Sequence, residues 1–348
     1  MQKKFELGIT TFADVMPDPH TGITISHAER IRQVVDEIVL ADELGLDFYG
    51  VGEHHRADFA ASAPAIILAA AAGKTKHITL GTAVSVLSTT DPIRLYQEFA
   101  TIDAISHGRS ELLVGRGGFT ESFPLFGYEL SQYEKLFDEH LDLLLQARDN
   151  EFVTWQGQTR SGIRHLGIYP RTEKPLSISM ALGGSRSTII KAGKKGLPAV
   201  LAVLGGRLPD FAQYGQLYRD TAVQSGHDPG KMKFSVHAHG FVLSDGKEAE
   251  ETFFPYIAYY RSSLMSGRGL PPYSRYDYDG GRSPEGAIFV GGPQEVADKI
   301  LLLRKHLGID RFFIQMPVAT MPHDLVLKAI KAYATEVAPR VRAGIQNK

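Results

Sequence analysis

The chain has 348 residues, of which 43% are hydrophobic and 22% are charged, a composition that predicts an ordinary globular protein with a large core. Its 38 lysines and arginines nearly balance its 39 aspartates and glutamates, so the sequence offers no general attraction for nucleic acid or anionic lipid. The absence of cysteine excludes disulfides, thiolate nucleophiles and cysteine-ligated metal centres.

The first residues lack the features of a signal peptide, and the most apolar stretch, 64–73, is about half of the roughly 20 residues that span a bilayer. We therefore expect a cytoplasmic protein that binds neither nucleic acid nor a membrane.

Short apolar or β-branched runs recur along the chain and predict eight strands, at 5–10, 47–53, 78–87, 110–115, 176–182, 198–204, 234–243 and 311–317. Between the first two runs, Ile31, Val34, Val35 and Ile38 have the spacing of an amphipathic helix, and Gly45 supplies its end. Further helices are predicted at 64–73, 92–105, 132–147, 187–195, 210–225 and 294–307.

Strands that alternate with helices pair in parallel, and eight such units close most economically as a (β/α)8 TIM barrel, here a single α/β domain over 1–348. The alternative is an open doubly wound sheet. It is disfavoured because Thr10, Thr11 and Phe12 follow the first strand in place of a glycine-rich dinucleotide fingerprint.

The segment 266–286 is an insertion loop after the seventh strand, rich in Gly, Pro, Tyr and Arg and without either periodicity. In a barrel it would overhang the active face, either as a mobile lid or as an ordinary surface loop.

The first group of chemical interest is Glu53, His54 and His55, at the end of the second strand. Ionisable residues at the carboxyl end of a barrel strand point towards the active mouth, which favours a functional role. Adjacent residues of a strand face opposite sides, so His54 and His55 are not expected to bind one metal together, and one of them can be a packing residue.

Glycines and small residues mark three further positions. The third strand ends in small residues at 81–87, which lets a flat ring approach the backbone, although a tightly packed strand would look the same. Arg116 lies among the glycines 115–118, a phosphate-type turn or a plain tight turn. The segment 183–188 precedes a helix, where free amides bind anions, although Ser185 or Ser187 can simply cap the helix.

His237 and His239 are two residues apart on the seventh strand and so face one side. They could ligate a metal if a further histidine and a carboxylate converged on them, but a role in the core or in lining a pocket is favoured.

The segments 41–55, 78–118, 181–198 and 290–316 resemble the bacterial-luciferase-like flavin-dependent monooxygenases, and together they cover most of the chain outside about 200–285. The resemblance implies a (β/α)8 barrel that binds FMN, with the flavin ring over the third strand.

Carried over by position, His54 resembles the active-site histidine of the family. Ala83 and Val84 resemble the strand end that supports the ring, where a non-prolyl cis peptide is common. The positions that resemble the family's phosphate contacts are Arg116, Gly184, Ser185 and Thr188.

The sequence also departs from the family. Gly115 stands where the luciferases carry a reactive cysteine, so light emission and an aldehyde substrate are not implied. Glu134 stands where some relatives place a second phosphate-binding arginine, which makes the anion site less positive. A deazaflavin-using branch shares the scaffold, and deazaflavin is therefore the second choice of cofactor.

The expected reaction uses reduced FMN, delivered by a separate flavin reductase, and O2 to oxygenate a small organic substrate. His54, with an unperturbed pKa of roughly 6.5, would exchange a proton near neutrality. Arg268, Arg275 or Arg282 would meet an anionic group of the substrate, and the family suggests a homodimer.

Two rival functions stay open: a metal-dependent hydrolase that uses His54, His237 and His239, and a flavin-binding protein without catalysis. The flavoenzyme prediction includes no metal.

Overall fold

The computed structural model describes residues 4–265 and 271–346. Within this part of the chain, eight parallel strands close into a barrel in the order β1, β2, β3, β5, β8, β9, β10, β12, with β12 paired back to β1. Their bounds are β1 Glu6–Thr11, β2 Phe48–Val51, β3 Thr79–Thr82, β5 Ser110–Gly115, β8 Ser177–Leu182, β9 Ala199–Ala202, β10 Phe234–Val242 and β12 Arg311–Gln315. Each lies within or next to a predicted strand, and the TIM-barrel prediction is confirmed.

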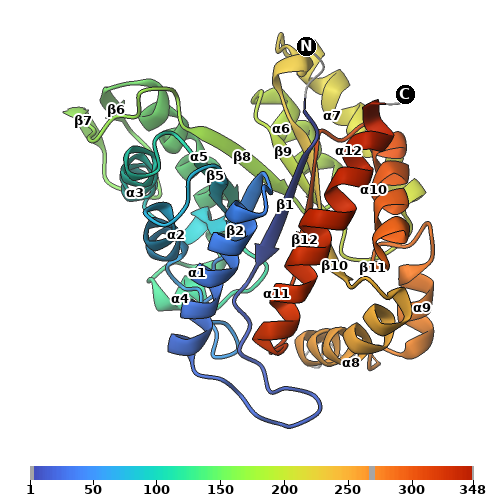
Figure 1. Ribbon diagram of the computed structural model, residues 1–348. Helices are drawn as coiled ribbons and strands as arrows, with labels where there is room; N and C mark the ends of the chain where they lie inside the picture. The colour runs from blue at the N-terminus through green and yellow to red at the C-terminus, as the bar shows by residue number, and fades with distance from the viewer. Residues whose placement is uncertain (1–3, 266–270, 347–348) are drawn as a thin grey trace.

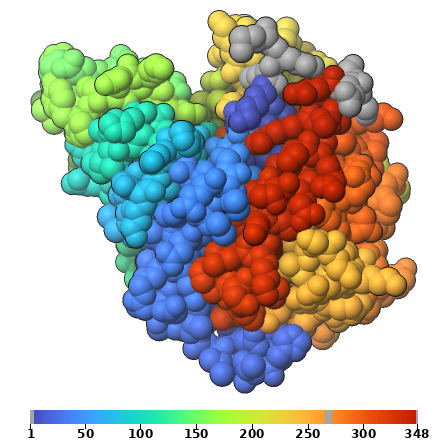
Figure 2. All heavy atoms as spheres, viewed as in Figure 1, coloured from blue at the N-terminus to red at the C-terminus, as the bar shows by residue number. Residues whose placement is uncertain are grey.

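Helices surround the barrel (Figure 1). The main ones are α1 His27–Glu43, α2 Pro64–Ala72, α3 Pro92–Ile105, α5 Tyr133–Asp149, α6 Arg186–Lys194, α7 Ala212–Gln224, α10 Pro293–Leu307, α11 His323–Ala332 and α12 Ala338–Gln346. A turn of π-helix, η6 Tyr333–Val337, joins the last two. Figure 2 shows the C-terminal helices beside α1, and α11 packs against α1, so the two ends of the chain meet in the outer layer.

Local capping explains where several helices begin and end. The Ser26 side chain accepts a hydrogen bond from the amide of Glu29 at the start of α1. Asp91 caps α3, whose first residue is Pro92, and α10 ends at Gly308 with a left-handed φ of 63°.

The structure adds short elements that the sequence patterns do not predict. They are the antiparallel pair β6 Phe152–Trp155 and β7 Ile163–Gly167, β11 Phe289–Gly291, α4 Ser122–Leu125, and the 3-10 turns η1 Leu87–Thr89, η2 Leu130–Gln132, η3 Leu208–Phe211 and η4 Pro229–Lys231. The predicted strand 78–87 divides into β3 and a short β4 Ser85–Val86. The β6–β7 hairpin projects from the body of the molecule in Figure 2.

Four of the longer helices lie where none was predicted: α8, α9, and the C-terminal α11 and α12. α8 Gly246–Met265 follows β10, and α9 Arg275–Arg282 lies inside the predicted loop. Residues 266–270 of that loop lie outside the described residues. α9 forms because Ser274 and Asp277 make a capping box. The predicted loop 266–286 therefore contains a helix. Its sequence has no helical repeat of apolar residues, so the pattern did not predict it.

The barrel interior is filled in layers by alternate strands. Phe48, Leu113, Val200 and Phe313 form one layer. Towards the amino ends, buried Arg311 spans the barrel to Glu111 with N–O distances of 2.6 and 2.8 Å. Towards the carboxyl ends lie the residues described next.

Candidate active site

The carboxyl rim of the barrel has small residues on one side and buried polar residues on the other. A Cβ atom built on Gly50 would lie 2.9 Å from the Cβ of Ala83, and one built on Gly115 would lie 2.9 Å from Val84. On the other side, the neighbouring strands β10 and β12 supply His237 and Gln315, which are both buried. Gln315 is the register partner of His239. The rim thus separates a surface of small side chains from a hydrogen-bonding surface.

His54 lies just beyond β2, and its backbone amide donates to the carbonyl of Ala61 at 3.0 Å. The imidazole is enclosed by three phenylalanine rings, with centroid distances of 4.7 Å to Phe12, 4.4 Å to Phe59 and 5.1 Å to Phe119. Its Nε2 atom is buried and has no hydrogen-bond partner. An unpartnered polar atom in an apolar enclosure calls for a ligand or a functional explanation.

Burial lowers the pKa of His54 to about 4. The imidazole is therefore neutral at neutral pH. The expectation that it keeps an unperturbed pKa and exchanges protons near neutrality is wrong in this environment, because the surrounding rings disfavour the imidazolium. A neutral His54 can still donate or accept a hydrogen bond at Nε2.

Phe119 limits the space beside His54. The cavity that these two residues line with Gly117 and Gly118 has a volume of only about 10 Å³. Arg56 holds the segment that contains Phe119 in place. Its guanidinium lies 4.7 Å from the Phe119 ring centroid and pairs with Glu121 at 3.0 Å. A planar ligand that reaches His54 must displace Phe119.

Glu53 and His55 support the rim. One oxygen of the Glu53 carboxylate accepts from the amide of Val86 at 2.9 Å, and the other lies 2.8 Å from Nε2 of His55. His54 and His55 contact different groups, as expected of neighbours along a strand. The structure thus gives Glu53 a positioning role for the segment that follows β3.

That segment contains Ala83 and Val84, whose peptide bond is cis. The amide of Ala83 donates to Val51, and the carbonyl of Val84 accepts from Glu53, both at 2.9 Å. The predicted ring-supporting segment is therefore fixed to β2, beside His54.

Arg116 follows β5, and its guanidinium pairs with Glu134 at 3.0 Å and lies 5.3 Å from the ring centroid of Tyr133. Glu134 therefore lies next to the predicted phosphate-binding arginine and neutralises part of its charge. An incoming anion must compete with this exposed carboxylate.

The turn before α6 follows β8, the neighbour of β5, so it lies on the same rim as Arg116. Gly184 has a left-handed φ of 88°, and a Cβ atom at that position would meet no other atom within 4 Å. Ser185 is the N-cap of α6, and its hydroxyl lies 3.0 Å from the hydroxyl of Thr188. The capping role is therefore present, and the turn also presents hydroxyls and open backbone at a helix start.

The seventh barrel strand, β10, places His237 and His239 inside the rim. Burial lowers the pKa of His237 to about 4 and also holds the pKa of His239 well below its usual value. Phe12 lies between His54 and His237, with ring distances of 4.7 and 6.2 Å. Across 4–265 and 271–346, no group of three or more His, Asp or Glu side chains is arranged to hold a metal.

The arginines predicted to meet a substrate lie in different surroundings. Arg275 pairs with Glu251 and Arg282 pairs with Glu250, both on α8, while Arg268 lies outside the described residues. Arg275 and Arg282 are thus engaged with carboxylates in this structure, and their contact with a substrate stays a prediction. The sequence analysis missed Arg261, which lines a cavity of about 390 Å³ on the carboxyl rim.

Other aromatic residues near the barrel mouth divide between rim and surface. Phe12 and Phe119 do enclose His54, and Tyr273 lines the rim cavity. His20 is exposed and packs edge-on against Tyr256 with a ring distance of 5.6 Å.

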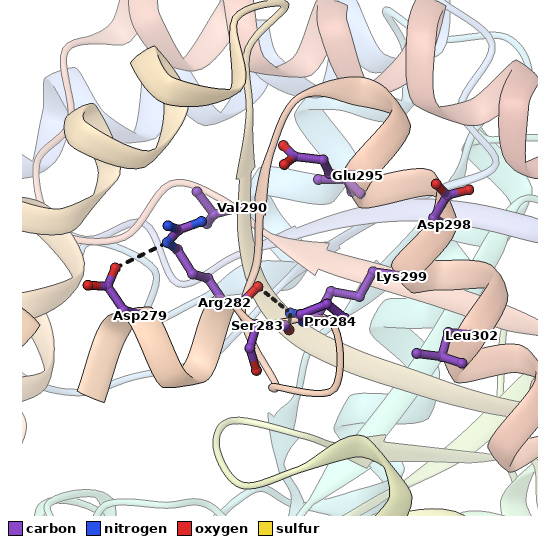
Figure 3. Close-up of a pocket in the computed structure, with 10 residues that line it drawn as sticks. Asp279, Arg282, Ser283, Pro284, Val290, Glu295, Asp298, Lys299 and Leu302 are labelled. Atoms are coloured by element: carbon purple, nitrogen blue, oxygen red, sulfur yellow. Dashed lines mark hydrogen bonds and ion pairs between the residues drawn. The ribbon is translucent and has the colours of Figure 1, made fainter. Parts of the chain in front are cut away.

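A cavity of about 410 Å³ lies away from this rim, between α9 and α10 (Figure 3). The ammonium of Lys299 reaches across it to carbonyl oxygens that include Ser283 at 2.7 Å and Ile288 at 2.6 Å. Because its donors are engaged with the backbone, we assign Lys299 a structural role.

The model of a family described as luciferase-like monooxygenase matches residues 5–311. The chain belongs to the luciferase-like monooxygenase family. The resemblance noted from the sequence is thereby confirmed. No helix among the described residues has both the length and the apolar character needed to cross a membrane.

Among curated relatives of this family member, the Sinorhizobium fredii protein y4vJ is 25% identical and the match covers 96% of this chain and 98% of the relative. The alkanal monooxygenase alpha chain of Photobacterium leiognathi is 26% identical, with 65% of this chain and 63% of the relative covered.

Solved structures share the fold of this luciferase-like chain. The monooxygenase RslO1 from Streptomyces bottropensis superposes with a TM-score of 0.83 at 23% identity, covering 96% of this chain and 99% of that one. The oxygenating constituent of 3,6-diketocamphane monooxygenase from Pseudomonas putida, in complex with FMN, gives 0.75 at 20% identity and coverages of 97% and 99%. A coenzyme F420-dependent secondary alcohol dehydrogenase gives 0.75 at 17% identity, with the same coverages.

Proposed function

We propose that this protein is a monooxygenase that uses reduced FMN and O2 to oxygenate a small organic substrate. The observation that carries the proposal is the unpartnered Nε2 of His54, enclosed in phenylalanine rings beside the Ala83–Val84 segment. Family membership supports an oxidoreductase of this kind.

The rim residues fit a flavin phosphate and ring. Arg116, the amides near Gly184 and the hydroxyls of Ser185 and Thr188 would hold the phosphate, because they combine a guanidinium with donors at a helix start. The space beside Gly184 supports this assignment, because a Cβ atom at Gly184 would have no other atom within 4 Å and a phosphate could therefore approach the backbone. Ala83 and Val84 would support the ring once Phe119 has moved away.

The bound reduced flavin supplies two electrons and two protons, so that one oxygen atom of O2 enters the substrate and the other leaves as water. His54, which is neutral, would direct a hydrogen bond from or to Nε2 at the reacting oxygen. Phe12 and Phe59 exclude water around that atom, which strengthens the hydrogen bond.

We favour FMN over coenzyme F420 because the rim offers a compact anion cradle suited to one phosphate group. One structural neighbour is a complex with FMN, and another is F420-dependent, so the neighbours support a flavin-type cofactor in general. The lack of a dinucleotide fingerprint after β1 favours a separate reductase as the source of reduced flavin.

We also propose a homodimer. α2 is apolar on all sides, which is typical of a buried helix, yet Ile66 on it is 69% exposed. A second copy of the chain would cover this face.

The cofactor is tested by titrating the protein with oxidised and reduced FMN, FAD and coenzyme F420. We expect FMN to bind at least tenfold more tightly than F420. Arg116→Gln should weaken FMN binding about tenfold, the scale of a hydrogen bond to a charged group, while Glu134→Gln should not weaken it. Failure of both oxidation states of FMN to bind would refute the proposal.

Catalysis is tested by oxygen consumption with reduced FMN and a substrate panel, after subtraction of released peroxide. His54→Ala should keep FMN affinity and lose oxygen transfer by about 100-fold, the usual scale of a positioned acid–base group. His77→Ala is the control, because His77 is exposed at the amino end of β3. Unchanged turnover in His54→Ala would remove His54 from the mechanism, and stoichiometric zinc or manganese would favour the hydrolase.

A further inference from the structure

The cavity of about 390 Å³ lies where the ends of β9 and β10 face α8. Figure 1 shows α8 on the side of the barrel towards which β1 points, which is the carboxyl rim. Leu204, Leu264 and Pro271 supply apolar walls, and Arg261 supplies a positive charge. The volume is within the range of small-molecule sites, roughly 300–1,000 Å³.

Arg261 lies in this cavity without a close counter-ion. Its guanidinium donates to the carbonyl of Leu204 and lies 4.8 Å from the ring centroid of Tyr273. No carboxylate of the described residues forms an ion pair with it. Asp277 also lines the cavity and acts on the Arg261 charge, but its carboxylate accepts hydrogen bonds from the amide and hydroxyl of Ser274 at 3.0 and 2.6 Å.

A guanidinium has five N–H donors in a fork that matches a carboxylate, and a partly buried guanidinium is costly to leave unpaired. Burial accordingly lowers the pKa of Arg261. Arg275 and Arg282 pair with glutamates, so among the described residues Arg261 is the arginine on this side of the rim that is available to an anion.

A second polar group faces the same cavity. His239 is 3% exposed, lines the cavity and has an Nδ1 atom without a hydrogen-bond partner. Its ring lies 5.6 Å from that of Tyr260. A buried, unpartnered imidazole nitrogen beside an unpaired guanidinium indicates a ligand with more than one polar atom.

The cavity lies on the same rim as His54. His239, which lines the cavity, is two residues from His237 on β10. The ring of Phe12 lies 6.2 Å from that of His237 and 4.7 Å from that of His54. A ligand anchored at Arg261 would therefore extend towards the histidine that we place at the reacting oxygen.

We propose that this cavity binds the substrate, and that the substrate is a small, largely apolar carboxylic acid whose carboxylate pairs with Arg261. The apolar walls receive its hydrocarbon part, and His239 offers one further hydrogen bond. This inference rests on the proposed monooxygenase function, because it assigns the substrate of that reaction.

The test measures binding to the flavin-free protein by calorimetry, so it does not depend on turnover. The probes are straight-chain carboxylates of six to twelve carbons and 3-phenylpropanoate, each compared with its own primary amide. At least one acid should bind tenfold or more tightly than its amide. Arg261→Gln should abolish this preference, while binding of the amides changes less than threefold.

Arg207→Gln is the matched control, because Arg207 is exposed and pairs with Glu285 on the neighbouring loop. It should retain the full preference for the acid. FMN affinity is measured on the same three proteins and should be equal in all of them.

Three outcomes would overturn the inference: no acid binds better than its amide, the preference survives in Arg261→Gln, or Arg261→Gln loses FMN binding. The last would make Arg261 a contact of the cofactor. If FMN itself fails to bind the wild-type protein, the proposed function fails separately, whatever the acids do.

Discussion

At the scale of single residues, the carboxyl rim is unusual for its buried neutral histidines. Burial lowers the pKa values of His54 and His237 to about 4. The sequence placed both residues on this rim, because strand position and alternation fix the side on which a residue lies. It could not give their protonation states, which depend on aromatic residues brought in from other parts of the chain, such as Phe119.

These histidines should make the folded protein sensitive to mild acid. A histidine with a pKa of about 4 when folded and 6.5 when unfolded stabilises the fold fully above pH 6.5, and this stability is lost as the pH falls towards 4. Between pH 7 and pH 5 the loss is about 2 kcal/mol per histidine. When the pH is lowered from 7 to 5, the free energy of unfolding of His237→Gln should therefore fall by about 2 kcal/mol less than that of the wild type. Urea unfolding at the two pH values measures this difference.

The control for this experiment is His77→Gln, because His77 is exposed. It should show the wild-type loss of stability. An equal loss in His237→Gln and wild type would show that His237 is not held neutral in the folded protein.

At the scale of elements, strands and most helices followed from apolar periodicity, but α8 did not. Phe253, Tyr256, Ile257 and Tyr260 are buried at helical spacing, so the signal was present. Pro255 lies inside the helix, where proline normally predicts a break. Because α8 was not predicted, Arg261 was not recognised as a residue of the rim. The arginines predicted to meet a substrate were those of the segment 266–286 instead.

Contacts between elements are harder still to predict, and Lys299 is an example. Its ammonium, on α10, donates to four carbonyl oxygens between Gly281 and Ile288, which fixes the segment after α9 (Figure 3). Sequence reasoning would place a helical lysine in solvent, because a lysine is rarely buried without partners.

Replacing Lys299 by methionine should therefore destabilise the junction of α9 and α10. The side chain keeps a similar length, but the buried carbonyl oxygens lose their donor, at a cost of about 1–3 kcal/mol. Urea unfolding measures the cost, and Lys305→Met, on an exposed position of the same helix, serves as control. Equal stability of Lys299→Met and Lys305→Met would contradict the structural role.

At the scale of the whole molecule, the barrel is held across its interior by Arg311 and Glu111, which come from strands on opposite sides. Arg311 also stacks on Phe313 at 4.5 Å and donates to Ser235 at 3.2 Å. The nearby Arg311 charge lowers the pKa of Glu111 against the opposing effect of burial. Topology brings the two residues together, and their separation in sequence gives no sign of the pairing.

Glu111→Gln should cost about 3–5 kcal/mol of unfolding free energy, because it leaves the Arg311 charge buried without a counter-ion. The double variant Glu111→Leu with Arg311→Met should cost less, since both charges are removed and apolar volume is kept. In the wild type the contribution of Glu111 is present above its unfolded pKa of about 4.3 and is lost only at lower pH. Urea unfolding at pH 7 compares the variants, and a double variant no more stable than Glu111→Gln would show that packing, rather than charge pairing, sets the cost.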